Sequence, residues 1–312
     1  MTNPAQANPS QRAGIYACVA ARILWGGTAW YMAQSHSHDA FSLFYQRLLW
    51  AFAFCFLLSA ASGALADVRR LVATRQALAV NLLAAALIST NWFAVFWCIM
   101  HHHVVEASFG FFIAPMLTTL LGLLVLREPL TTWTASALLL CLGGVLVMFA
   151  PVGQAGAWHA PWQVPLIAVT STVYAFLRKR HPVPPMVGNL FETGAALVTW
   201  TVIGCSAGIL ANPLGETGDP LWYEAGIGVV TTVPMLLYVY SLRRTSLSLN
   251  AYLQYITPTV MFVLGMLVLG EAVVPAKLAG FALIWMAIVS YLVGMRRVQT
   301  PILAMTPREQ KA

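Results

Sequence analysis

The sequence predicts an all-α polytopic membrane protein: ten transmembrane helices from two inverted five-helix repeats. Of its 312 residues, 59% are hydrophobic and 9% are charged, whereas a soluble domain is usually about a quarter charged. The apolar residues gather into ten stretches, several of them near the ~20 residues that a helix needs to cross a bilayer. In addition, one long pattern occurs twice, once in each half of the chain.

The ten expected spans are separated by short polar turns, and the sixth is the shortest. We expect a cytoplasmic tail over 1–13, a first repeat over 14–150, an external linker over 151–161, a second repeat over 162–295 and a cytoplasmic tail over 296–312. The spans in order are 14–33, 41–63, 77–99, 104–126, 132–150, 162–178, 187–210, 221–241, 246–269 and 274–295.

The repeated pattern is PMLTTLLGLLVLRE, which begins at Pro115, and PTVMFVLGMLVLGE, which begins at Pro258, 143 residues further on. The glutamates that close the two strings, Glu128 and Glu271, stand at the same offset. Five spans in each half is an odd number, so the second half must insert upside down relative to the first. Inverted repeats of this kind are typical of secondary transporters.

Basic residues predict the orientation. All of the 17 Lys and Arg except Arg22, Arg47 and Lys277 fall in segments that lie on one side if the amino end is inside. Positive charge marks cytoplasmic loops, so we expect both termini in the cytoplasm. The net charge of +7 therefore does not indicate a nucleic-acid partner, and the five cysteines, all within apolar stretches, do not indicate a disulfide framework.

The two matched prolines interrupt the helix ladder. Pro115 and Pro258 fall in the middle third of the fourth and ninth spans, where a missing N–H frees backbone carbonyls. Freed carbonyls at membrane depth line a cavity, and matched discontinuous helices point to the substrate site. The alternative is a kink that serves packing alone.

Aromatic and amide side chains surround these prolines. Walls of this kind suit an amphipathic organic solute, although aromatic stripes in membrane helices also serve packing or an interfacial belt. We therefore expect the substrate cavity to be lined by Trp25, Asn91, Trp92, Trp97, Phe111, Pro115, Tyr174, Tyr252, Gln254, Tyr255 and Pro258.

Ionisable residues within spans require partners, because a lone charge in hydrocarbon is costly. Similar depth in the bilayer suggests pairing of Arg47 with Glu106 and of Arg22 with Glu192.

The turn at His101–His103 precedes Glu106 by a few residues. Three interpretations are compatible with this pattern. The turn is a solvated polar turn, a metal site, or an external gate or proton site formed by Arg47, His102, His103 and Glu106. Further ligands at a firm spacing are missing, so we expect no metal and no cofactor.

The stretches NWFAVFWCIMHHHVVEASFGFFIAPMLTTLLGLLVLREPL (91–130) and TTVPMLLYVYSLRRTSLSLNAYLQYITPTVMFVLGMLVLGE (231–271) resemble the RarD proteins of the EamA branch of the drug/metabolite transporter superfamily. Tyr45-Gln46-Arg47, Trp25-Gly26 and Phe191-Glu192-Thr193 match as well, whereas the resemblance implies an uncharged residue where Arg22 stands. It also implies ten helices from an inverted repeat, a cavity lined mainly by spans one, three, four, six, eight and nine, and a bacterial inner-membrane permease.

The function that follows is a multi-pass secondary permease of the bacterial inner (plasma) membrane, not an enzyme. Its partners would be a small organic metabolite or amphipathic drug, the lipid bilayer and protons as a coupling ion. Two alternatives stay open: a membrane-embedded metal-dependent enzyme that uses the His101–His103/Glu106 cluster, and a non-transporting membrane scaffold.

Overall fold

The computed structural model describes residues 9–36, 39–125, 132–149, 162–209, 218–242, 244–245 and 253–304, and the regular structure within these ranges is α-helical. Its helices lie close to the expected spans, except that the ninth begins later and the last continues past residue 295. They are α1 (Pro9–Met32), α2 (Ala40–Ala61), α3 (Leu65–Leu71), α4 (Arg75–Met100), α5 (Val104–Val125), α6 (Thr132–Phe149), α7 (Gln163–Arg180), α8 (Pro185–Ser206), α9 (Leu221–Leu242), α11 (Ile256–Leu267) and α12 (Pro275–Ala304).

Three described helices are long and apolar enough to cross a membrane: Ala40–Ala61, Arg75–Met100 and Met186–Ser206. Shorter apolar helices lie at Val104–Ala114, Ala135–Val147, Ile256–Leu267 and Pro275–Ser290. α7 is not among these helices, because it ends in the basic run Arg178-Lys179-Arg180. The count of ten spans therefore stays a prediction.

Two differences from the expected spans have local causes. The first is α3, which the apolar pattern does not reveal because it is a short helix with Asp67 in its first turn and Arg69 and Arg70 in its last, charges that suit the helix dipole. The second is that α11 begins only at Ile256, directly after a turn at residues 254 and 255.

The chain folds into two compact units, and each takes residues from both halves of the sequence. The first comprises Met1–Phe111 and Gln163–Glu271, and the second Phe112–Trp162 and Ala272–Ala312. α5 contributes its first eight residues to the first unit and the rest to the second.

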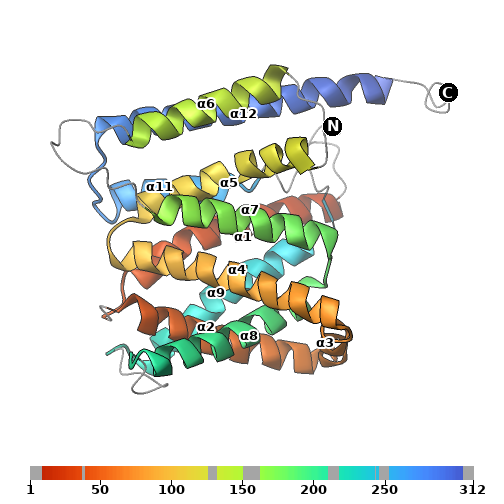
Figure 1. The fold of residues 1–312 in the computed structure, drawn as a ribbon, viewed down its shortest axis with the longest axis vertical. Helices are drawn as coiled ribbons and strands as arrows, with labels where there is room; N and C mark the ends of the chain where they lie inside the picture. The colour runs from red at the N-terminus through yellow and green to blue at the C-terminus, as the bar shows by residue number, and fades with distance from the viewer. Residues whose placement is uncertain are drawn as a thin grey trace. The chain divides into compact units, whose positions relative to one another are not determined.

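In the first unit, α1 packs on α9 and α11, α2 packs on α8 and α9, and α4 packs on α7 and α8 (Figure 1). Aromatic rings fill the space between α2, α4 and α8. The buried Phe44 ring meets Phe93, Phe96 and Trp200 edge-on, with centroids 5.6, 5.5 and 5.1 Å away. Such aromatic contacts contribute beyond the area they bury, so they fix these three helices against one another.

Glycines allow two close helix contacts in the first unit. A Cβ added to Gly26 of α1 would lie 2.6 Å from Val260 Cβ of α11, and one added to Gly110 of α5 would lie 2.7 Å from Ile167 Cβ of α7. Real Cβ atoms do not approach so closely, so the absence of a side chain permits both contacts. Small residues serve the same purpose in many membrane helix pairs.

The second unit is built on α6 and α12, which lie side by side (Figure 1). The Ser136 and Ser290 hydroxyls form a hydrogen bond of 2.6 Å across the pair. A Cβ on Gly144 would come within 2.9 Å of the Gly280 carbonyl oxygen, so the two backbones are close there as well.

Candidate functional site

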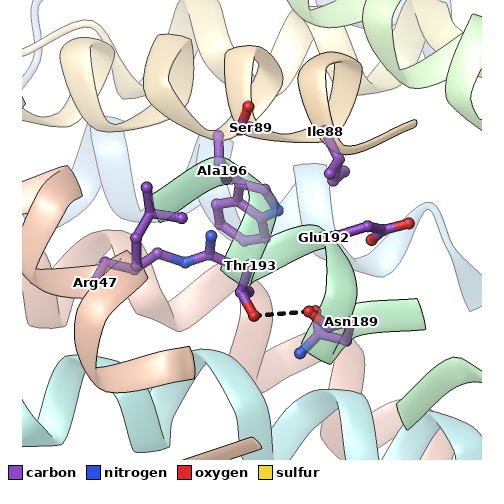
Figure 2. Close-up of a pocket in the computed structure, with 9 residues that line it drawn as sticks. Arg47, Ile88, Ser89, Asn189, Glu192, Thr193 and Ala196 are labelled. Atoms are coloured by element: carbon purple, nitrogen blue, oxygen red, sulfur yellow. Dashed lines mark hydrogen bonds between the residues drawn. The ribbon is translucent and has the colours of Figure 1, made fainter. Parts of the chain in front are cut away.

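A small cavity lies in the first unit between α2, α4 and α8 (Figure 2). Its volume is about 20 Å³, which is room for roughly one water molecule. Arg47 and Trp92 are the two residues of the expected site that line it. The complete lining is Arg47, Leu48, Ile88, Ser89, Trp92, Asn189, Glu192, Thr193 and Ala196.

Arg47 reaches from α2 into this cavity (Figure 2). Only 7% of the residue is exposed, and its guanidinium carbon lies 4.7 Å from the centre of the Trp92 ring. The ring face attracts a cation at this distance. The buried Arg47 Nε has no hydrogen-bond partner, so a donor of the guanidinium is left unused.

Glu192 of α8 is held by groups from α7. Its Oε1 accepts a hydrogen bond from Arg178 Nε at 3.0 Å and a second, short one from Arg178 Nη2. The Tyr174 hydroxyl also donates to the carboxylate, at 3.0 Å from Oε1. In Figure 2 the Glu192 carboxylate points away from Arg47. Arg178 therefore compensates the charge of Glu192.

A chain of hydrogen bonds continues from Arg178 to the end of α3. Arg178 Nη1 donates to Asn81 Oδ1 of α4 at 2.7 Å, and Asn81 Nδ2 donates to the carbonyl oxygen of Leu71 at 2.9 Å. The sequence indicates Arg178 only as part of a cytoplasmic basic cluster, because nothing in it brings Glu192 onto the same face of the bundle.

Among the described residues, the two ion pairs expected from depth do not form. Arg47 stacks on Trp92, and Glu192 pairs with Arg178. Arg22 instead lies over the rings of Trp25 and Tyr238, at 5.3 and 4.6 Å from their centres. The prediction failed because the position of a residue along its helix does not determine the direction in which its side chain points.

Glu106 lies near the histidine turn. Its Oε1 is 3.5 Å from Nδ1 of His103. The Trp97 ring stacks on those of His101 and His103, with centroids 4.0 and 5.7 Å away. His102 has φ = 58°, an uncommon conformation for a residue other than glycine. Within the described residues, no three His, Cys, Asp or Glu side chains are grouped so that they could hold a metal ion.

Glu271 caps the amino end of α5. Its two carboxylate oxygens accept hydrogen bonds from Val104 N at 2.6 Å and Val105 N at 2.8 Å. A negative charge at a helix N-terminus is favourable. Burial raises the pKa of the Glu271 carboxyl even though both N–H groups favour its charged form. The sequence identified Glu271 only as the repeat counterpart of Glu128, a residue outside the described ranges, and did not predict that Glu271 caps α5.

Two residues expected in the cavity hold helices together instead. Asn91 is buried, and its Nδ2 lies 3.0 Å from Ile167 O, 2.9 Å from Thr170 Oγ1 and 2.9 Å from Ser171 Oγ, all on α7. Trp25 Nε1 donates to the Thr231 carbonyl oxygen of α9 at 3.4 Å.

The remaining expected residues are dispersed. Gln254 is exposed in the turn before α11, Tyr255 is buried there, and Phe111 packs at the margin of the main hydrophobic cluster. Pro258 lies in the first turn of α11, where proline removes no helix hydrogen bond, so its expected position within a helix is corrected. Pro115 lies within α5, and Tyr252 and the side chain of Pro115 are outside the described residues.

A bundle of apolar helices around buried ionisable groups defines a helical membrane protein. The chain belongs to the EamA-like transporter family, whose model matches residues 12–150 and 164–293. It is thus a membrane transporter of the drug/metabolite transporter superfamily.

The relatives extend over nearly the whole chain. Protein RarD of Salmonella typhimurium is 30% identical over 90% of this chain and 95% of its own. Protein RarD of Escherichia coli is 30% identical over 90% of this chain and 94% of its own. Chloramphenicol-sensitive protein RarD of Pseudomonas aeruginosa is 27% identical over 88% of this chain and 92% of its own.

A crystal structure of another protein shares the fold. It matches with a TM-score of 0.59 at 18% sequence identity, covering 91% of this chain and 98% of the other.

Proposed function

We propose that this transporter is a secondary permease of the bacterial inner membrane, which moves a small organic metabolite or amphipathic drug by alternating access. The proposal builds on membership of the EamA-like transporter family. It adds ten spans, an inverted repeat and cytoplasmic termini to what the family establishes. The observation that carries it is the pattern of helix packing.

Six of the helix contacts are preserved when the two halves are exchanged. The repeat makes α1, α2, α4, α5 and α6 the counterparts of α7, α8, α9, α11 and α12. The exchange converts α1–α9 packing into α4–α7 packing and α2–α9 packing into α4–α8 packing, and all four contacts occur. The α2–α8 and α6–α12 contacts map onto themselves. Two related halves around a pseudo-two-fold axis give this pattern.

The close glycine contacts follow the same rule. Gly26 brings α1 against α11, and Gly110 brings α5 against α7, the corresponding pair after exchange. In each pair the partner is β-branched, Val260 or Ile167. Each pair joins a helix of one half to a helix of the other, so the two contacts are counterparts under the exchange.

The cavity fits one stage of such a cycle. Room for roughly one water molecule is too little for an organic solute, so transport requires a second conformation with a wider site. We place the gate or proton site at the His103–Glu106 contact, on the side that the basic loops leave external.

Solute flux tests the function. The purified protein would be reconstituted into liposomes loaded with a panel of small organic metabolites and drugs, with protein-free liposomes as the control. We expect saturable efflux of at least one solute, accelerated when the same solute is present outside, because a carrier returns faster when loaded. Flux that rises without saturation would contradict alternating access, and no flux of any panel member would contradict a permease.

A further inference from the structure

We infer that the cavity between α2, α4 and α8 is a subsite for one carboxylate group of the solute, bound by Arg47. This inference rests on the proposed function and deepens it by naming a substrate class. It begins from burial: Arg47 is 7% exposed, and its Nε has no hydrogen-bond partner. A buried charge with an unused donor is costly unless an acceptor arrives.

The protein itself supplies no matching anion within the cavity lining. Of the nine lining residues, only Arg47 and Glu192 are ionisable. The Glu192 carboxylate already accepts from Arg178 and Tyr174, and it points away from Arg47 (Figure 2). Glu192 attracts Arg47 electrostatically, but its hydrogen bonds come from Arg178 and Tyr174, so the unpartnered Nε of Arg47 remains available to a ligand.

Three neutral polar side chains of the lining make hydrogen bonds within the protein. Thr193 Oγ1 donates to the Asn189 carbonyl oxygen at 2.7 Å, the contact drawn in Figure 2. Ser89 Oγ donates to the Ala86 carbonyl oxygen at 3.2 Å, and Asn189 Nδ2 lies 2.9 Å from Cys55 Sγ. Recognition in this cavity therefore centres on the guanidinium.

The chemistry of the guanidinium selects the ligand. A planar guanidinium can bind a carboxylate with two parallel hydrogen bonds while it lies over an aromatic ring, and Arg47 lies over Trp92. One negative charge balances Arg47, whereas a phosphate dianion would bury an excess charge. The small volume excludes a whole solute, so only the head group would lie beside Arg47, in the wider conformation that transport requires. The solute class is thus an organic monocarboxylate whose apolar part extends beyond the cavity.

Matched ligand pairs test the subsite. The probes are benzoate with benzamide and indole-3-acetate with indole-3-acetamide, each pair differing only in the head group, a charged carboxylate or a neutral amide. Binding to the purified protein in detergent would be measured by isothermal titration calorimetry and by the shift in melting temperature. We expect the carboxylate to bind at least about tenfold more tightly than its amide, a ratio that corresponds to ~1.4 kcal/mol.

Variants of Arg47 test whether this residue causes the preference for carboxylate over amide. Arg47→Gln should abolish the carboxylate preference, and Arg47→Lys, which keeps the charge but loses the planar fork, should retain part of it. Arg22→Gln is the matched control, since Arg22 is also buried, has an unpartnered Nε and lies over aromatic rings but does not line the cavity. Arg22→Gln should keep the full preference.

A second variant covers the case in which Arg47→Gln does not fold. Thr193→Asp would place a carboxylate in the same cavity, where it would occupy Arg47 and remove the preference for carboxylate probes.

The outcomes separate this inference from the proposed function. Solute flux and amide binding without any carboxylate preference would overturn the subsite and leave the permease intact. A preference that survives in a folded Arg47→Gln or Thr193→Asp protein would overturn it equally. If the wild type neither binds any probe nor moves any solute, the proposed function fails and the subsite fails with it.

Discussion

Arg178 belongs to a basic cluster that the sequence places in a loop, yet in the structure it connects three helices. Its side chain is 13% exposed, and it connects Glu192 to Asn81 across three helices. The acid it neutralises is 6% exposed, so removal of the arginine strands a buried charge. Loss of one partner of a buried pair is far more harmful than loss of both.

We predict that Arg178→Ala lowers the free energy of unfolding by roughly 3–5 kcal/mol, and that the double variant Arg178→Ala/Glu192→Gln recovers part of the loss. The reason is that the neutral amide introduced by Glu192→Gln leaves no charge to be stranded. Thermal unfolding in detergent, read by circular dichroism, measures both. A double variant as unstable as the single one would show that packing, not charge, is the main contribution of Arg178.

The Asp219 carboxylate makes the stability of the protein depend on pH. Burial opposes its charge, but hydrogen bonds from the His36 N–H at 2.8 Å, the Ser35 hydroxyl and the His36 ring outweigh burial and lower the pKa of the Asp219 carboxyl. A lowered folded-state pKa stabilises the protein above the unfolded value of about 3.9, and the gain is lost as pH falls through the folded pKa.

We therefore expect wild type to be more stable than Asp219→Asn at neutral pH, with the difference shrinking below about pH 4. Melting temperatures of the two proteins across a pH series provide the measurement. A difference that is constant down to the lowest pH would mean that the charge of Asp219 contributes nothing.

Among the helices, α9 contains a proline that the repeat pattern did not reveal. Pro234 lies inside α9, whereas Pro258 lies in the first turn of α11. A proline within a helix removes one ladder hydrogen bond and costs about 3 kcal/mol, while one in the first turn costs little.

The expected outcome is that Pro234→Ala raises the melting temperature and slows solute flux, because α9 straightens, and that Pro258→Ala, the matched control, changes stability little. Melting curves and proteoliposome flux would be recorded for each variant. Equal effects of the two substitutions would refute this account of α9.

The helices were predictable because a long apolar stretch has few alternatives in a bilayer. What the sequence could not provide was the rotation of each helix about its axis. The expected spans place Arg47 and Glu106 at similar depth, yet Arg47 contacts Trp92 and Glu106 contacts His103. Rotation depends on packing between helices far apart in the chain, such as the contacts of Phe44 with Trp200 and of Gly26 with Val260.

At the scale of the whole molecule, the inverted repeat predicts which segments face which side. In a chain whose native cysteines are replaced, Gly156→Cys in the expected external linker should react with an impermeant thiol reagent in intact cells. His181→Cys, an exposed position beside the basic run of α7, should react only after the membrane is opened. The reverse pattern would refute the proposed orientation.

The hydrogen-bond chain from Leu71 through Asn81 and Arg178 to Glu192 also predicts which mutations suppress one another. It joins the short helix α3 in the 64–76 segment to the carboxylate beside the cavity. A lesion at Asn81 should thus disturb Glu192 without touching it. Screens for second-site suppressors of an Asn81 defect should return substitutions on α7 and α8, helices far from Asn81 in the sequence.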